Sequence, residues 1–493
     1  MRGSEGRRAA SFGGRLASLW ESLGSSLWFL PSSMTAGVVV LFGVTYWIDL
    51  RLQGSLTGLP FLFSGSPESS RSLLSTVSES LITVLATTFS ITIVALQLAS
   101  GQYSPRLLRT FMADRGVQSV LGAYIATFVY SQLTLRVTGR SGQGAEAFNP
   151  LVSVTVATVF ALVCIGLFIY FIQHVATIIQ SSAIVEKAHE DSVGAVERLP
   201  ALDGAEEDGS RALPGGLKAG EAAVLTARRS GYVQRLDLDF LAKVVSGGMK
   251  EGGVVVVEVP CGPGRFVSAG LPLARVWPSG ALEETGEGAH GAFVFGRERS
   301  FEQDFAFGLR QLSDIALKGL SPGVNDPTTA MQAMDRMEAV LIALVGRALP
   351  PRVQEREVGG VRVVFEVGVY DYDDVVGLAF DQIRRAAFTS GQVAVLERLL
   401  EILDRLARAN ASTHRRRALW ARAFTVARLA PSQMDDPHDA TNLLLRVLGI
   451  GAFLARTELR PEVVRDVKEI AELSTELPGG ERVRAATAAV SAS

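Results

Sequence analysis

The 493-residue chain has few of the residues from which disulfide-rich folds and metal centres are built. It contains two cysteines, Cys164 and Cys261, which fall in different regions, and five scattered histidines. Two distant cysteines provide neither a disulfide framework nor a cysteine-rich metal site, and the histidines show no metal-ligand spacing. We therefore predict a protein without a metal or other cofactor.

An excess of one charge is also missing, because 48 Lys and Arg residues stand against 50 Asp and Glu residues. This balance offers no basic surface of the kind that nucleic acid requires. The motifs of common enzymes are absent too: there is no phosphate-binding glycine loop with Lys, no HExxH and no GxSxG. We predict that the protein is not an enzyme and does not bind nucleic acid.

Long apolar runs, by contrast, are abundant in the first 180 residues. Four of them are long enough to cross a bilayer. The first follows Arg7 and Arg8 but has no small-residue cleavage site, which favours an uncleaved membrane helix over an export signal. The four predicted spans are about Leu27–Asp49, Leu73–Ser100, Val117–Val137 and Leu151–Gln180.

The arginines beside these spans predict the orientation. Four lie in the N-tail and three between the second and third spans, whereas the opposite side has two in each of its two loops. Cytoplasmic loops carry the excess of positive charge, so both termini are expected in the cytoplasm. The protein is then a multi-pass membrane protein with a cytoplasmic C-terminal part.

A polar seam runs along the second span. Steps of four and three residues from Thr76 lie on one side of a helix, and most of these positions are polar. In hydrocarbon, such a seam must face other helices or water. The steps reach Thr76, Ser80, Thr83, Thr87, Ser90, Val94, Gln97 and Gly101. The candidate lining of a path, which we call the seam below, consists of Thr76, Glu79, Ser80, Thr83, Thr87, Ser90, Val94 and Gln97.

Two interpretations of the seam stay open. Serine and threonine hydroxyls often join membrane helices through hydrogen bonds worth about 0.6 to 2 kcal/mol each. Alternatively, the seam lines a water-filled path, which requires a ring of identical chains because four helices rarely enclose a pore. In the second case Phe89 and Ile93 are possible hydrophobic gates.

Charged residues near the two ends of the seam do not decide which ion would pass. Glu79 near the outer end would favour cations, whereas Arg106 and Arg109 at the inner mouth would favour anions. Each also has a simpler interpretation, as a solvated interfacial group or a lipid anchor. On the fourth span, His174 could sense pH, although a hydrogen-bonded histidine explains it as well.

The remainder of the chain predicts an α+β region. Short β-rich runs separated by Gly and Pro predict a small β domain, and apolar residues at helical spacing predict a mainly helical domain after it. The expected organisation is an N-tail at 1–26, the membrane domain at 27–180, a helix and linker at 181–220, the β domain at 221–278, the helical domain at 300–475 and a flexible tail at 479–493.

The stretch SPGVNDPTTA contains a strong helix start. Asn325 or Asp326 suits the N-cap, and Pro327 suits the first helical position. The exposed N–H groups at such a start can also bind an anion. Asn325, Asp326 and Thr328 are therefore candidate contacts for an anion or ligand, beside the plain structural role of a cap.

YSPRLLR after the second span and SPGVNDPTTA in the soluble part are the marks of a resemblance. The chain resembles a widespread bacterial family of predicted integral membrane proteins of unknown function, over most of its length. The resemblance implies a multi-span inner (plasma) membrane protein with a cytosolic domain, and it supplies no activity.

Together these observations favour a homo-oligomeric membrane channel for ions, lined by the second span and regulated by the cytoplasmic region. The alternative is a non-conducting membrane-anchored sensor or scaffold, whose cytoplasmic part binds a ligand or protein partner. In both cases the lipid bilayer is the surrounding medium.

Overall fold

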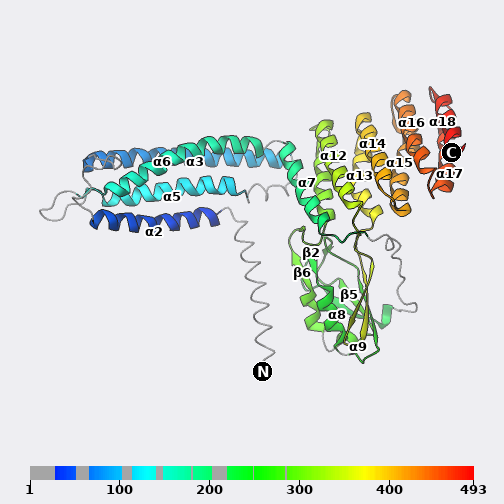
Figure 1. Cartoon of the computed structure of the whole chain (residues 1–493), viewed down its shortest axis with the longest axis horizontal. Helices are drawn as coiled ribbons and strands as arrows, with labels where there is room; N and C mark the ends of the chain where they lie inside the picture. Colours follow the sequence, from blue (N-terminus) through cyan, green and yellow to red (C-terminus); the bar gives the residue numbers. More distant parts are fainter. Residues whose placement is uncertain are drawn as a thin grey trace. The chain divides into compact units, whose positions relative to one another are not determined.

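The computed structural model describes residues 28–51, 66–102, 114–139, 148–178, 181–202, 219–247, 249–283 and 286–492. The chain divides into two compact units (Figure 1), a membrane unit up to Ile184 and a C-terminal unit from Val185. The expected N-tail, most of the expected linker, and Arg106 and Arg109 lie outside the described residues.

Among the residues described above, four candidate membrane helices form the membrane unit, as predicted. All four are long and apolar enough to cross a bilayer. Their ends lie within a few residues of the predicted spans, except at the start of the second. The helices are α2 (Phe29–Arg51), α3 (Pro67–Gln102), α5 (Arg115–Val137) and α6 (Leu151–Ile178).

Helix α3 begins six residues before the predicted Leu73 because the preceding segment supplies a helix start. The Ser69 backbone N–H donates to Ser66 Oγ (3.2 Å). Pro67 follows at the first helical position, where its missing N–H costs nothing, and Glu68 is favourable in the first turn. These residues are polar, so an apolar run alone does not reveal them.

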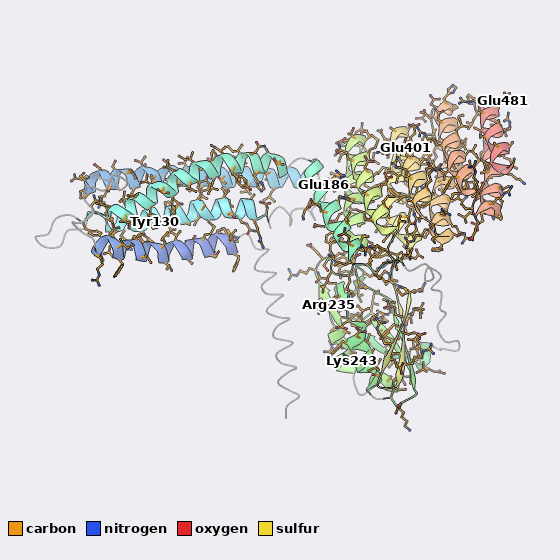
Figure 2. All side chains as sticks on the ribbon, in the orientation of Figure 1. Tyr130, Glu186, Arg235, Lys243, Glu401 and Glu481 are labelled. Carbon is orange, nitrogen blue, oxygen red and sulfur yellow. The ribbon has the colours of Figure 1, made fainter. Side chains whose placement is uncertain are left out.

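Helix α5 occupies the centre of the membrane unit, in contact with α2, α3 and α6. Tyr130, labelled in Figure 2, lies on α5 and is fully buried. At Gly122 the backbones approach closely, because a Cβ atom there would lie 3.1 Å from the Pro31 Cα and 2.7 Å from the Met34 sulfur. Only glycine permits α2 and α5 to pack this tightly.

A buried carboxylate joins α2 to the start of α6. Asp49 accepts hydrogen bonds from the N–H groups of Val152 (2.8 Å) and Ser153 (3.0 Å) and from the Ser153 hydroxyl (2.6 Å). Thr45 lies 3.2 Å from the same hydroxyl and 2.8 Å from Tyr130 Oη. The first-turn N–H groups of α6 are thus satisfied by a negatively charged cap.

The C-terminal unit contains two sheets among its described residues. The larger has the strand order β1-β5-β3-β8-β7, and the smaller has the order β4-β2-β6. The strands are β1 (Ala223–Thr226), β2 (Gly231–Leu236), β3 (Val254–Val259), β4 (Phe266–Val267), β5 (Pro272–Trp277), β6 (Phe293–Gly296), β7 (Val353–Val358) and β8 (Val361–Val367).

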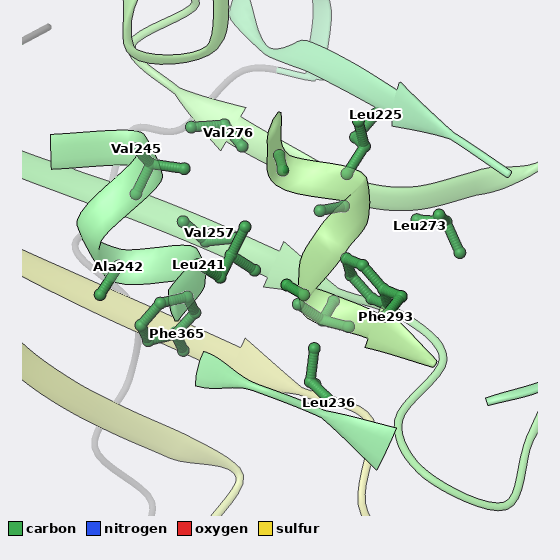
Figure 3. Packing of buried hydrophobic residues seen from close by; sticks show 14 of the residues in the cluster. Leu225, Leu236, Leu241, Ala242, Val245, Val257, Leu273, Val276, Phe293 and Phe365 are labelled. Atoms are coloured by element: carbon green, nitrogen blue, oxygen red, sulfur yellow. The ribbon is translucent and has the colours of Figure 1, made fainter. Parts of the chain in front are cut away.

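The centre of the larger sheet is the parallel pair β3 and β8, in register from Val254 with Arg362 to Val259 with Val367. Its buried side chains pack against helix α8 (Leu238–Ser246), as Figure 3 shows for Leu241, Val257 and Phe365. Two short helices, α9 (Gly280–Glu283) and α10 (Gly286–Ala289), lie between β5 and β6.

The β structure extends beyond the expected range of 221–278. Strand β6 lies beyond this range, after α9 and α10, and β7 and β8 come from the region expected to be mainly helical. The physical reason lies in β3, which has the sequence VVVVEV and buries three consecutive valines, Val255 to Val257. Such a strand needs a neighbour on each side, and β8 provides the second one from about 100 residues away.

Among the described residues, eight further helices lie in the C-terminal unit after β6. The tail, which we expected to be flexible, instead forms α18, where Val483 and Val490 are buried. The helices are α11 (Ala306–Gly319), α12 (Pro327–Leu344), α13 (Tyr372–Thr389), α14 (Val393–Ala409), α15 (Thr413–Gln433), α16 (Pro437–Leu454), α17 (Arg460–Leu473) and α18 (Gly480–Ala492).

Helix α7 (Ser181–Glu197) follows α6 in the chain and is attached to the helices of the C-terminal unit. A Cβ atom at Gly308 of α11 would collide with the Ser192 side chain, so α7 and α11 touch at this point. Glu186, labelled in Figure 2, forms an ion pair with Arg336 of α12 (2.7 Å). Helix α7 is therefore fixed to α11 and α12 by contacts of two kinds.

Candidate functional site

The polar seam of α3 faces away from the other three membrane helices. All eight seam positions are exposed. The opposite side of α3 is buried in the membrane unit and carries its own polar residues, Ser78, Thr88 and Thr92. The seam positions are Thr76, Glu79, Ser80, Thr83, Thr87, Ser90, Val94 and Gln97.

The seam threonines bond to their own helix. The Thr76, Thr83 and Thr87 hydroxyls donate to the carbonyl oxygens of Ser72 (2.9 Å), Glu79 (3.1 Å) and Thr83 (2.9 Å). Each hydroxyl hydrogen is thereby used inside α3, and the lone pairs of the oxygen remain on the outward side. The seam therefore presents hydrogen-bond acceptors to whatever lies against it.

The remaining polar seam residues are less fully bonded. Glu79 accepts a hydrogen bond from the Ser75 hydroxyl (3.1 Å), and its carboxylate stays exposed. The side chains of Ser80, Ser90 and Gln97 have no hydrogen bond within the part of the chain that the structure describes. These groups would be costly against hydrocarbon.

The two predicted gate residues point in different directions. Phe89 is half-buried and packs on the apolar cluster that holds α3, α5 and α6 together. Ile93 is 50% exposed and lies beside the equally exposed Val94 of the seam. The structure therefore brings Ile93, and not Phe89, to the outward side of α3.

The outward faces of α2 and α6 provide a reference for the seam. From Val159 to Ile172, every exposed position of α6 except Tyr170 is apolar or glycine, and Leu162 is 63% exposed. The exposed side of α2 is also mainly apolar, with Val40, Val44 and Trp47. These faces suit lipid, and the outward face of α3 differs from both.

The candidate anion contacts lie at the start of α12 in the C-terminal unit. Asp326 accepts hydrogen bonds from the Thr329 hydroxyl (2.5 Å) and the Thr329 N–H (3.0 Å), which hold the pKa of its carboxyl below the usual value. Asn325 has a positive φ of 47° and accepts from Gln392 (3.1 Å), and Thr328 is exposed. The carboxylate of Asp326 thus takes up the N–H groups that an anion would need.

His174 of α6 has a defined partner. Its Nε2 lies 2.8 Å from Asp114 Oδ1, and its ring stacks on Tyr170 at 5.1 Å. Asp114 is also the N-cap of α5, since it accepts from the Val117 N–H (2.9 Å). The pair joins the C-terminal half of α6 to the start of α5.

Sequence reasoning missed the carboxylate of Asp49 as an internal bond of the membrane unit. The residue stands at the end of an apolar run, where it looks like an ordinary boundary residue. Its partners, Val152 and Ser153, begin another span about 100 residues later. The sequence does contain one signal for this bond. Arg51 already marks the end of the span, so a second charged residue before it, Asp49, lies within the span and needs a partner there.

Comparison with known proteins agrees with a membrane protein. The family described as "Predicted membrane protein (DUF2254)" matches residues 24–405. "Uncharacterized protein Mb1321c" of Mycobacterium bovis and "Uncharacterized protein Rv1290c" of Mycobacterium tuberculosis are each 34% identical over 464 residues, which cover 92% of this chain and 84% of theirs. No solved structure matches the chain.

Proposed function

The chain belongs to the DUF2254 family of predicted membrane proteins, and we propose that it is a homo-oligomeric ion channel whose path is lined by α3. The observation that carries the proposal is the outward direction of the whole polar seam. In a single subunit this face would lie against hydrocarbon. In a ring of copies the same face surrounds a shared axis and can be wetted.

The chemistry of the seam favours a cation. The Thr83 and Thr87 hydroxyls give their hydrogens to backbone carbonyls and turn lone pairs outward. Glu79 adds a carboxylate at one end of the seam. Rings of oxygen acceptors and carboxylates replace the water around a cation and repel anions.

The proposed gate lies at Ile93 and Val94. Both are half exposed, and they follow Ser90 on the outward side of α3. A ring of apolar side chains at this level would close the path by excluding water. Phe89 is not part of this proposal, because its ring packs inside the membrane unit.

We place the protein in the inner membrane with both termini in the cytoplasm, so that the C-terminal unit can regulate the channel. Helix α7 follows α6 and is fixed by the contact of Ser192 with Gly308 and by the ion pair of Glu186 with Arg336. A movement of α11 or α12 would therefore also move α7, which follows the last membrane helix in the chain.

Ion flux through purified protein in liposomes tests this function. Thr83→Leu with Thr87→Leu should lower cation flux at least about tenfold, because the oxygen acceptors are replaced by apolar groups. Thr177→Leu is the matched control, since Thr177 is an exposed threonine of α6 with the same type of bond, to the Gln173 carbonyl (2.9 Å). Its flux should equal that of the wild type.

The oligomeric state gives a second, independent result. The proposal predicts a stable ring of identical chains in lipid nanodiscs, visible by mass measurement. A monomer in nanodiscs, or unchanged flux in the double variant, would overturn it. The alternative is the membrane-anchored sensor, for which the bonding of the seam threonines to their own helix is the supporting observation, because it makes the seam tolerable in contact with protein or lipid.

A further inference from the structure

A pocket lies where the two parallel strands of the larger sheet end. Its volume is about 580 Å³, within the range of small-molecule sites. The loops that follow β3 and β8 form part of its wall, and the carboxyl ends of parallel strands are where ligands often bind in sheets that contain helices. The lining residues are Pro260, Cys261, Arg265, Phe266, Arg352, Gly368, Val369 and Asp374.

The charges that line the pocket favour an anion. Arg265 and Arg352 contribute two guanidinium groups, whereas Asp374 is the single carboxylate among the lining residues. That carboxylate already accepts from the Asp371 N–H in the capping box of α13. Arginine is the side chain best suited to hold phosphate or carboxylate, through paired N–H donors.

Each arginine is held by a separate contact. The Arg265 guanidinium lies over the ring of Tyr370, 4.5 Å from its centre, and has no ion pair in the part of the chain that the structure describes. Arg352 donates from Nε to Glu366 (3.0 Å). Glu366 therefore pairs with part of the Arg352 guanidinium, while Arg265 is oriented by the aromatic contact and attracted by the buried carboxylate of Asp304.

The loop that carries Arg265 rests on a buried ion pair. Gly264 has a positive φ of 83°, and a Cβ atom there would collide with the Asp304 carboxylate. Asp304 is almost fully buried and receives a bond from Arg299 (2.6 Å), although burial raises the pKa of its carboxyl more than this partner lowers it. The two loops also touch, because a Cβ atom at Gly368 would lie 2.3 Å from the Pro260 carbonyl oxygen.

A flat apolar surface adjoins the charged part. Phe266 is 53% exposed and meets the ring of Tyr232 edge to face, with 5.2 Å between the ring centres. An exposed aromatic ring beside two arginines offers stacking area to a planar group. We infer that this pocket, the β3–β8 pocket, binds a small organic phosphate that carries a flat ring, with Arg265 and Arg352 on the phosphate and Phe266 on the ring.

Cys261 makes occupancy of the β3–β8 pocket measurable. It lines the pocket and is partly exposed, whereas the second cysteine, Cys164, is buried in the membrane unit. The experiment follows the rate at which N-ethylmaleimide modifies Cys261 in the full-length protein in detergent. Mass spectrometry of the Cys261 peptide separates this reaction from any at Cys164, so no cysteine has to be replaced.

Adenosine monophosphate is the probe. Pyrophosphate tests the anion without the ring, and adenosine tests the ring without the anion. At about four times its dissociation constant a bound probe leaves about one fifth of the sites free, so modification should slow about fivefold. Adenosine monophosphate should protect at the lowest concentration, pyrophosphate at a higher one, and adenosine not at all. Arg265→Gln and Arg352→Gln should each remove the protection.

Arg362→Gln is the matched control, because Arg362 is an exposed arginine of β8 that is paired with Glu355 (2.8 Å) and does not line the pocket. Its protection should equal that of the wild type. Thermal unfolding of each variant shows that the unit is folded. Absence of protection by both phosphates, or equal protection in Arg265→Gln, would overturn the inference. The result does not depend on conduction, so it stands or fails separately from the channel.

Discussion

The outward faces of α3 and α6 belong to the same membrane unit and differ in chemistry, because α3 mixes polar side chains with apolar ones such as Ile93. Helix α6 exposes Leu162, Ile165 and Ile169, whereas α3 exposes Thr83, Thr87 and Ser90 at comparable positions along its length. Neither face is used to hold the four helices together. The face of α6 suits hydrocarbon, whereas the proposed channel requires the face of α3 to meet protein or water.

Replacing a polar residue that faces the inside of the membrane unit should have the largest effect. That effect should be on the stability of the unit and not on ion flux. Asp49→Ala leaves the N–H groups of Val152 and Ser153 without their buried acceptor. The membrane unit should lose about 4 kcal/mol of unfolding free energy, because charged hydrogen bonds and orphaned donors cost about 1 to 3 kcal/mol each. Unfolding in detergent by a denaturant series measures this change.

Asp49→Asn is the control for that variant, since an amide oxygen can still accept one of the bonds. Its loss of unfolding free energy should be less than half of the loss in Asp49→Ala. Equal losses in Asp49→Ala and Asp49→Asn would show that the negative charge, and not the acceptor oxygen, holds the start of α6.

A charged residue introduced on the outward face of α6 or of α3 should have the next largest effect, which is on membrane insertion. Leu162→Glu puts a carboxylate into lipid and should reduce membrane insertion by about 3 kcal/mol, the cost of a charge near the middle of a span. Ser90→Glu on α3 should insert almost normally, because the proposed channel places this exposed side chain against water or another subunit. Glycosylation-tagged insertion assays compare the two, and equal losses would remove the distinction between the faces.

A polar residue at the proposed gate should have an intermediate effect. Ile93→Ser should raise resting ion leak about tenfold, corresponding to about 1.4 kcal/mol, because the apolar ring then retains water. Ile169→Ser, a change of the same kind on the lipid face of α6, should leave the leak unchanged. Liposome flux without any stimulus measures both. A leak that rises equally in the two variants would point to general damage to the unit.

Removal of the seam carboxylate should have the smallest effect. Glu79→Gln should lower the preference for cations over anions about threefold, since a ring of negative charge at the mouth is lost. Glu68→Gln is the control, an exposed glutamate in the first turn of the same helix. Reversal potentials in a salt gradient measure the ratio. An unchanged ratio in Glu79→Gln would place this residue outside the ion path.

The sequence is sufficient to locate the four membrane helices, because a segment of about twenty predominantly apolar residues is typical of a helix that crosses a bilayer. The sequence also reveals the seam, because the spacing of its polar residues can be recognised within the single segment that forms α3. It does not reveal on which side of α3 the other helices lie, because Ser78, Thr88 and Thr92 are polar too and are buried. That choice depends on packing against α5 and α6, which no local pattern records.

The β structure could be predicted only in part, because local sequence indicates strands but not which strands pair. Runs such as VVVVEV predict strands, yet the partner of β3 is β8, and this pairing is decided by the tertiary fold. The β3–β8 pocket was missed entirely, since its arginines lie far apart in the sequence. The cap at Asp326 was recognised correctly as a helix start because all of its parts are consecutive.

The parallel pairing of β3 with β8 also sets an order of events during synthesis. About 100 residues separate the two strands, so at about 5 to 20 residues per second β3 waits on the order of 5 to 20 s for its partner. During that time β3 can pair with β5, its native neighbour on one edge, while the valine-rich edge that β8 will cover stays unpaired. The growing chain therefore passes through a state in which one edge of β3 stays open until residue 367 has emerged from the ribosome.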